Sequence, residues 1–137
     1  MRFMMLMIPK GYESAAPGTM PDDMKALDAM MAYNRSLAEA GVLRAGDGLH
    51  PPSMGARVSF KGGKPIVMDG PFAEAKEVVG GYWIIEVASR ADAIEWAKRC
   101  PGGDNETIEV RQIQEVSDWP EPMQAKAKEW DKLKQRS

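Results

Sequence analysis

Two segments of this chain are apolar on both of the faces that an extended strand presents. In residues 2–8 the alternating side chains form two hydrophobic sets: Phe3, Met5, Met7 and Met4, Leu6, Ile8. Residues 81–87 are apolar on both sides in the same way. A strand with two apolar faces must be covered on both, whereas the two helices predicted in the main domain can cover only one. The second face is therefore predicted to pack on a second copy of the chain, in a two-fold homodimer.

Hydrophobic periodicity and turn signals divide the rest of the chain into strands and helices. Strands are predicted at 2–8, 42–49, 56–60, 65–68, 81–87 and 107–116, and helices at 22–40, 90–100 and 123–135. This order predicts an α+β fold, a ferredoxin-like βαββαβ sheet with an inserted hairpin. We expect one domain over residues 1–118 and a C-terminal helical extension over residues 119–137.

The last predicted helix is amphipathic. Its apolar stripe consists of Met123, Ala127, Trp130 and Leu133, and lysines flank it. Glu129 and Asp131 interrupt the positive charge, which disfavours a helix that lies on a membrane. The stripe therefore predicts docking on its own domain or across the dimer.

Composition excludes several classes of function. A net charge of −2 and a pI near 5.5 argue against a nucleic-acid-binding surface. The single cysteine, Cys100, excludes an intrachain disulfide and a cysteine-based zinc site. No segment approaches the ~20 apolar residues that span a bilayer, and the apolar start ends in Pro9 and Lys10 without a cleavage site for a signal peptide. We expect a cytoplasmic protein without a membrane partner.

The most unusual segment is the connection after the strand at 65–68. It reads Met68-Asp69-Gly70-Pro71-Phe72-Ala73-Glu74-Ala75-Lys76-Glu77. An Asp-Gly-Pro turn ends the strand, and Pro71 suits the first position of a helical turn. A hairpin needs only two residues to turn, whereas this connection places four ionisable groups around one aromatic ring. Such a segment is expected to shape a site or an interface.

This motif resembles that of the YCII-related family, in particular its DGPF branch. The branch carries Asp-Gly-Pro-Phe-Ala-Glu-Thr-Lys-Glu, and the chain departs from it only at Ala75. The resemblance covers roughly residues 1–116 and implies a dimeric α+β barrel. It also implies a link to extracytoplasmic-function sigma factors, beside which such proteins are often encoded. Better-defined members of the wider family carry a His–Asp pair with the histidine on the first helix, where this chain has none.

The motif supplies the candidate ligand-binding residues, namely Asp69, Gly70, Pro71, Phe72, Glu74, Lys76 and Glu77. Asp69 is expected either to cap the turn by accepting the backbone N–H of Phe72 or Ala73, or to present its carboxylate to a cleft. Glu74 and Glu77 with Lys76 could tune one another's proton affinity for acid/base chemistry. The alternative is a surface loop, or one that forms salt bridges to the partner subunit.

His50, the only histidine, follows a predicted strand and is a candidate general acid or base. It could pair with Asp47 or Asp69, or serve only in packing. We expect Asp69, Phe72 and Glu74 to lie at the same concavity as His50. Arginines on predicted strands (Arg44, Arg57 and Arg111) either point to solvent or form a salt bridge, or bind a carboxylate or carbonyl group from the inward face of a dimer cavity. One histidine and scattered carboxylates lack metal-ligand spacing, and no cofactor is expected.

The sequence is compatible with two functions. The first is a small-molecule-binding or regulatory module linked to sigma-factor signalling. The second is a cofactor-independent lyase, isomerase or hydrolase in which His50, Asp69 and Glu74 transfer protons. The missing histidine on the first helix favours the first.

Overall fold

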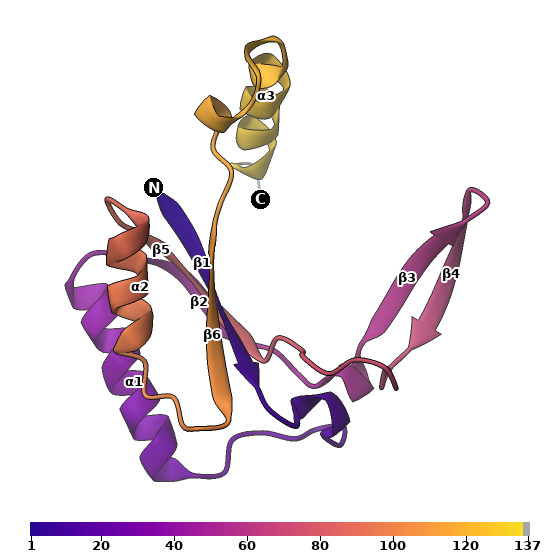
Figure 1. The fold of residues 1–137 in the computed structure, drawn as a ribbon, viewed down its shortest axis with the longest axis vertical. Coiled ribbons are helices and arrows are strands. Elements are labelled where there is room, and N and C mark those ends of the chain that lie inside the picture. The colour runs from indigo at the N-terminus through magenta and orange to yellow at the C-terminus, as the bar shows by residue number, and fades with distance from the viewer. Residues whose placement is uncertain (136–137) are drawn as a thin grey trace.

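The computed structural model describes residues 1–135 as an α+β fold built on antiparallel sheets, which confirms the predicted class (Figure 1). Its elements are β1 Arg2–Pro9, α1 Met24–Glu39, β2 Leu43–Gly48, β3 Ala56–Lys61, β4 Lys64–Asp69, β5 Gly81–Glu86, α2 Arg90–Lys98, β6 Glu106–Gln112 and α3 Gln124–Lys134. The main sheet has the order β2-β5-β1-β6, and β3 pairs only with β4. The order of elements is consistent with a ferredoxin-like fold that carries an inserted hairpin.

One face of the main sheet is covered by α1 and α2, which lie together on one side of it in Figure 1. The core between the layers consists of Phe3, Met5, Met7, Tyr33, Leu37, Trp83, Ile85 and Ala93. The Tyr33 and Trp83 rings meet edge to face with centroids 5.6 Å apart. The Tyr33 hydroxyl donates a 2.8 Å hydrogen bond to the carbonyl of Trp96. This polar link ties α1 to α2 over the buried face.

The opposite face of the sheet carries the second apolar set. Along β1 buried and half-buried residues alternate, so Met4, Leu6 and Ile8 point away from the helices. Tyr82 and Ile84 join them from β5, because they are the cross-strand partners of Leu6 and Met4. Burial therefore divides the sheet as expected, with the two helices covering one face only. We call this second surface the open sheet face.

The ends of α1 follow from local signals. Asp23 is the N-cap, and its carboxylate accepts the backbone N–H of Lys25 at 3.0 Å. The helix thus begins two residues later than predicted, because Asp23 caps the helix and lies outside it. Gly41 has a φ of 74°, the left-handed conformation expected after a helix. At α2, the Ser89 side chain is the cap and accepts the backbone N–H of Asp92 at 3.1 Å.

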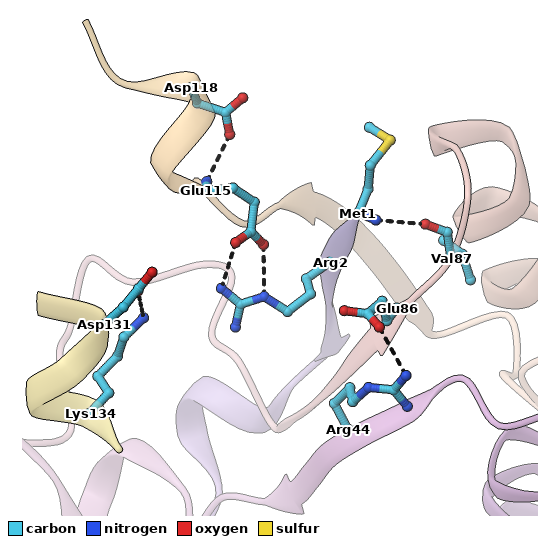
Figure 2. A network of polar contacts seen from close by, with 9 residues as sticks. All are labelled: Met1, Arg2, Arg44, Glu86, Val87, Glu115, Asp118, Asp131 and Lys134. Carbon is cyan, nitrogen blue, oxygen red and sulfur yellow. Dashed lines mark hydrogen bonds and ion pairs between the residues drawn. The ribbon is translucent and has the colours of Figure 1, made fainter. Parts of the chain in front are cut away.

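The last strand is shorter than predicted. β6 ends at Gln112 because the chain turns into a short 3-10 helix at Val116–Asp118, which Asp118 stabilises by accepting the backbone N–H of Glu115 at 2.8 Å. The Glu115 carboxylate binds Arg2 in a two-pronged ion pair, with Nε and Nη2 at 2.7 and 3.2 Å from its oxygens (Figure 2). This pair fastens the segment after β6 to the start of β1.

We expect Glu115→Gln to lower the free energy of unfolding by only about 0.2–1 kcal/mol, because the pair is partly solvated. The larger effect should be local, with faster amide hydrogen exchange over residues 113–119. Glu95→Gln is the matched control, since it removes an ion pair with Lys98 within α2. Equal exchange in the two variants would contradict the anchoring role.

Two segments project from the body of the molecule (Figure 1). The first is the hairpin of β3 and β4, in which every residue is exposed. Gly62 and Gly63 form its turn and both take positive φ, at 59° and 76°, as tight hairpin turns require. The hairpin nevertheless exposes a group of large apolar side chains, Val58, Phe60, Ile66, Val67 and Met68.

The second projecting segment is α3. Its half-buried residues are Gln124, Ala127 and Asp131, whereas Met123, Trp130 and Leu133 are exposed, with Trp130 at 60%. The prediction that this stripe docks on its own domain is therefore wrong for Met123, Trp130 and Leu133, and docking across a dimer stays a prediction. Residues 136–137 of the predicted extension lie outside the described part of the chain.

Candidate functional site

The motif begins where β4 runs into the body of the protein. The backbone N–H of Gly70 donates to the carbonyl of Gly55 at 2.9 Å. A Cβ atom at Gly70 would overlap the carbonyl oxygen of Pro52, so this position admits only glycine. The Gly70–Pro71 peptide is cis, and no helix begins at Pro71, contrary to the expected helical turn. The motif's glycine is therefore a packing contact between the hairpin base and residues 52–55.

Phe72 is the buried centre of the motif, with only 9% of its surface exposed. The guanidinium carbon of Arg57 lies 4.0 Å from the centroid of its ring, a distance typical of a cation–π contact. Phe72 also lines a cavity of about 390 Å³ together with His50, Pro51, Pro52, Val78 and Val79, among others. Arg57 is itself exposed, and its guanidinium covers the Phe72 ring.

The charged residues of the motif lie at the surface, unlike Phe72. Asp69, Glu74, Lys76 and Glu77 are all exposed, and within residues 1–135 their side chains form no hydrogen bond or ion pair. The predicted cap by Asp69 on Phe72 or Ala73 is therefore wrong. The turn is instead held by the backbone N–H of Ala75, which donates to the carbonyl of Phe72 at 3.0 Å.

The concavity expected around the motif is formed only in part. His50 and Phe72 line the 390 Å³ cavity, and Glu77 joins them. Asp69 and Glu74 line neither this cavity nor the larger one beside it. Of the four residues predicted to share one concavity, the structure brings only His50 and Phe72 together there.

A larger cavity of about 810 Å³ lies on the other side of His50. Its lining residues are Met7, Pro9, Tyr12, Thr19, Met20, Pro21, Met30, Asn34, Leu43, Gly46, Asp47, Gly48, Leu49, His50, Gly80, Gly81, Tyr82, Trp83 and Glu106. We call it the glycine-floored cavity, because the ends of β2 and β5 supply its glycines. His50 lines both cavities.

Strand register explains why this space is empty. Gly46 pairs with Trp83 and Gly48 pairs with Gly81, and Trp83 is buried on the helix-covered face. The glycines therefore face the helix layer without a side chain to fill it. A Cβ atom at Gly48 would meet no atom within 4 Å. The cavity follows from glycines within strands, a signal that often marks a place where a ligand approaches closely. Sequence reasoning missed it.

Hydrogen bonds hold the walls of the glycine-floored cavity in place. The Trp83 indole Nε1 donates to Asn34 Oδ1 at 2.8 Å, and the Tyr12 hydroxyl donates to the carbonyl of Leu49 at 2.6 Å. At the rim, the Tyr82 hydroxyl donates to Asp47 at 3.1 Å, which raises the pKa of Tyr82. These bonds join elements far apart in the chain, so the walls are fixed before any ligand arrives.

His50 has no acid/base partner in the described chain. Its side chain is exposed and makes no hydrogen bond within residues 1–135, while Asp47 is engaged by Tyr82. The suggested pairing of His50 with Asp47 or Asp69 is thus not formed. Of the other strand arginines, Arg44 pairs with Glu86 at 3.0 Å and Arg111 with Glu109 at 3.3 Å.

Comparison with known proteins identifies the family. The YCII-related domain matches residues 1–117. The chain belongs to the YCII-related family. An uncharacterised protein of Rhizobium meliloti (strain 1021) is 34% identical over 94 residues, which cover 67% of this chain and 76% of that protein.

The YCII-related match spans α1, α2 and all of the strands, and ends before α3. The resemblance implied a histidine on the first helix, whereas α1 of this YCII-related chain has none and lines the cavity with Met30 and Asn34. Within residues 1–135 there is no group of three or more His, Cys, Asp or Glu that could hold a metal ion. In the same residues, no helix is long and apolar enough to cross a membrane.

Proposed function

We propose that this YCII-related chain is a small-molecule-binding or regulatory module whose ligand occupies the glycine-floored cavity. The observation that carries the proposal is the cavity itself, about 810 Å³ in volume and preformed in the described chain. Small-molecule sites are commonly concave, mostly apolar and 300–1,000 Å³ in size, with a few polar groups that orient the ligand. This cavity combines methionine and aromatic walls with polar groups of Tyr12, Asn34 and Glu106.

The alternative, an acid/base enzyme, has less support from the geometry. Proton transfer needs a base within hydrogen-bond reach of a substrate at the site, and commonly a second group that orients it. His50 lines the cavity, but Asp69 and Glu74 do not. Of the three candidates for proton transfer, the enzyme hypothesis therefore keeps only His50. Turnover that is lost in His50→Ala while ligand binding is kept would favour it over the binding module.

We also propose that the module is a homodimer that packs through the open sheet face. In support, this face is apolar on β1 and β5 but only half-buried within one chain. The hairpin adds further exposed apolar surface, including Phe60 at 78% exposure. A two-stranded hairpin is marginally stable by itself, so a second copy would stabilise it. A stable interface needs roughly 800 Å² from each partner, so we expect the open sheet face and the hairpin both to contribute.

The regulatory part of the proposal rests on the resemblance to proteins encoded beside extracytoplasmic-function sigma factors. If such a factor is the partner, its affinity for this chain should change when the cavity is filled. A pull-down of a sigma factor encoded next to this gene, with and without ligand, tests the link. An operon of catabolic genes would instead favour the enzyme.

The site is tested by filling the cavity from its floor. We expect Gly48→Leu to fold normally, because its backbone is extended and the new side chain enters open space. Stability should stay equal or rise by up to about 1 kcal/mol, since glycine weakens a strand interior. A metabolite that stabilises the wild type by about 2.7 kcal/mol at 100 times its Kd should lose this effect in the variant.

Gly103→Leu is the matched control, because Gly103 also has open space around it but lies outside the cavity. The measurement is a thermal-shift screen of a metabolite library on the wild type and both variants. A ligand that stabilises Gly48→Leu as strongly as the wild type binds elsewhere. That outcome, or a library without a hit, would overturn the site.

A further inference from the structure

Several hydroxyl and indole hydrogens of the glycine-floored cavity are already donated within the protein. Three of its groups already give a hydrogen to the protein: Tyr12 to Leu49, Thr19 to Ala16 and Trp83 to Asn34, over 2.6–2.8 Å. A hydroxyl hydrogen that is donated inside the protein is not available to a ligand, whereas the oxygen can still accept. The donors that remain in the walls are the Asn34 amide and the ring of His50, whereas the oxygens of Tyr12 and Thr19 can still accept.

The charges around the cavity have one sign. Within residues 1–135, no lysine or arginine lines it, whereas Asp47 and Glu106 do. The Asp47 carboxylate is engaged by Tyr82. Glu106 is different, because its carboxylate makes no hydrogen bond or ion pair in the described chain. An anionic ligand would lose its hydration here without finding a counter-charge.

Glu106 is placed to meet a ligand inside the cavity. It is the cross-strand partner of Pro9, and two residues along β6 Ile108 pairs with the buried Met7. Side chains alternate along a strand, so Glu106 lies on the same, helix-covered face as Ile108. The aromatic rings of Tyr12 and Trp83 line the same space, and their faces attract cations.

We propose that the ligand of this cavity is a small organic cation with an apolar body, an alkyl- or arylammonium compound whose charge is met by Glu106. The inference rests on the proposed function and names its ligand class. The ammonium group donates to Glu106 and to the hydroxyl oxygens of the walls. The apolar body packs on the methionine and aromatic side chains.

The test uses three probes with the same aromatic body: phenethylamine, which is cationic at pH 7, neutral phenethyl alcohol and anionic 3-phenylpropionate. Titration calorimetry at low ionic strength should show the amine binding at least tenfold more tightly than the alcohol, and no binding of the anion. Raising the salt concentration should weaken the binding of the amine and leave that of the alcohol unchanged, because salt screens a partly exposed charge pair.

Glu106→Gln should reduce the affinity for the amine about tenfold and leave that for the alcohol unchanged. Glu95→Gln, which removes an equal charge on α2 outside the cavity, is the matched control. Three results would overturn the cation inference and leave the cavity as a binding site. They are equal affinity for the amine and the alcohol, tighter binding of the anion, and an affinity for the amine that is unchanged in Glu106→Gln. Binding of none of the probes also counts against the inference, and the Gly48→Leu screen then decides separately whether the proposed function falls.

Discussion

Replacing Phe72 by alanine is expected to lower the free energy of unfolding by about 3–5 kcal/mol, the usual cost of removing a buried aromatic side chain. Phe72 is 9% exposed, so most of its ring would be lost from the protein interior. The contact with Arg57 would disappear with it, at a cost of roughly 0.5–2 kcal/mol that is contained in this range. The hairpin should then detach from the body first.

Urea unfolding followed by circular dichroism measures this effect. Phe72→Leu is the graded control, because it keeps most of the volume and should cost less than about 1.5 kcal/mol. Amide exchange of β3 and β4 in Phe72→Ala reports whether the hairpin is released. A loss below about 1 kcal/mol would mean that the ring only borders the smaller cavity and that the motif has little structural role.

Leu6→Asp should abolish the proposed dimer. Leu6 lies on the open sheet face between Tyr82 on β5 and Glu109 on β6. An aspartate here would bury an unpaired charge in the interface and would repel Glu109 across the strands. We expect the dissociation constant to rise on the order of 100-fold or more, which corresponds to about 2.7 kcal/mol, together with some loss of sheet stability.

Light scattering at micromolar concentration measures the mass of both forms. Ala91→Asp is the matched control, because it adds the same charge at an exposed position of α2, away from the open sheet face. The control should keep the mass of a dimer. A wild-type chain that is monomeric, or a Leu6→Asp variant that remains dimeric, would refute packing through this face.

The elements predicted well are those specified by neighbouring residues. The alternation in β1 needs only a two-residue period, and the helix layer buries one alternating set, as expected. The inserted hairpin is likewise local, because its turn depends only on Gly62 and Gly63. Errors occur at element ends. A cap at Asp23 delays the start of α1, and a 3-10 helix follows the early end of β6.

The candidate site was harder to predict because its residues meet through distant contacts. The motif identified the family, yet its acidic side chains lie at the surface. The motif packs against the backbone of Pro52 and Gly55. Nothing in the sequence around these two residues indicates that they contact Gly70. The apolar stripe of α3 was recognised, but its exposure depends on how the segment after β6 leaves the sheet.

By itself, the sequence determined the α+β class, the family and the two-sided character of the central strands, because periodicity and turn chemistry act between near neighbours. Only the tertiary structure decided that a cavity lies over Gly46 and Gly48 and that His50 lies beside it without a carboxylate partner. It also decided which polar groups are already engaged, as in the bond from Trp83 to Asn34 across 49 residues. A vacant volume and a free acceptor depend on what every neighbouring element contributes, and those neighbours are brought together only by folding.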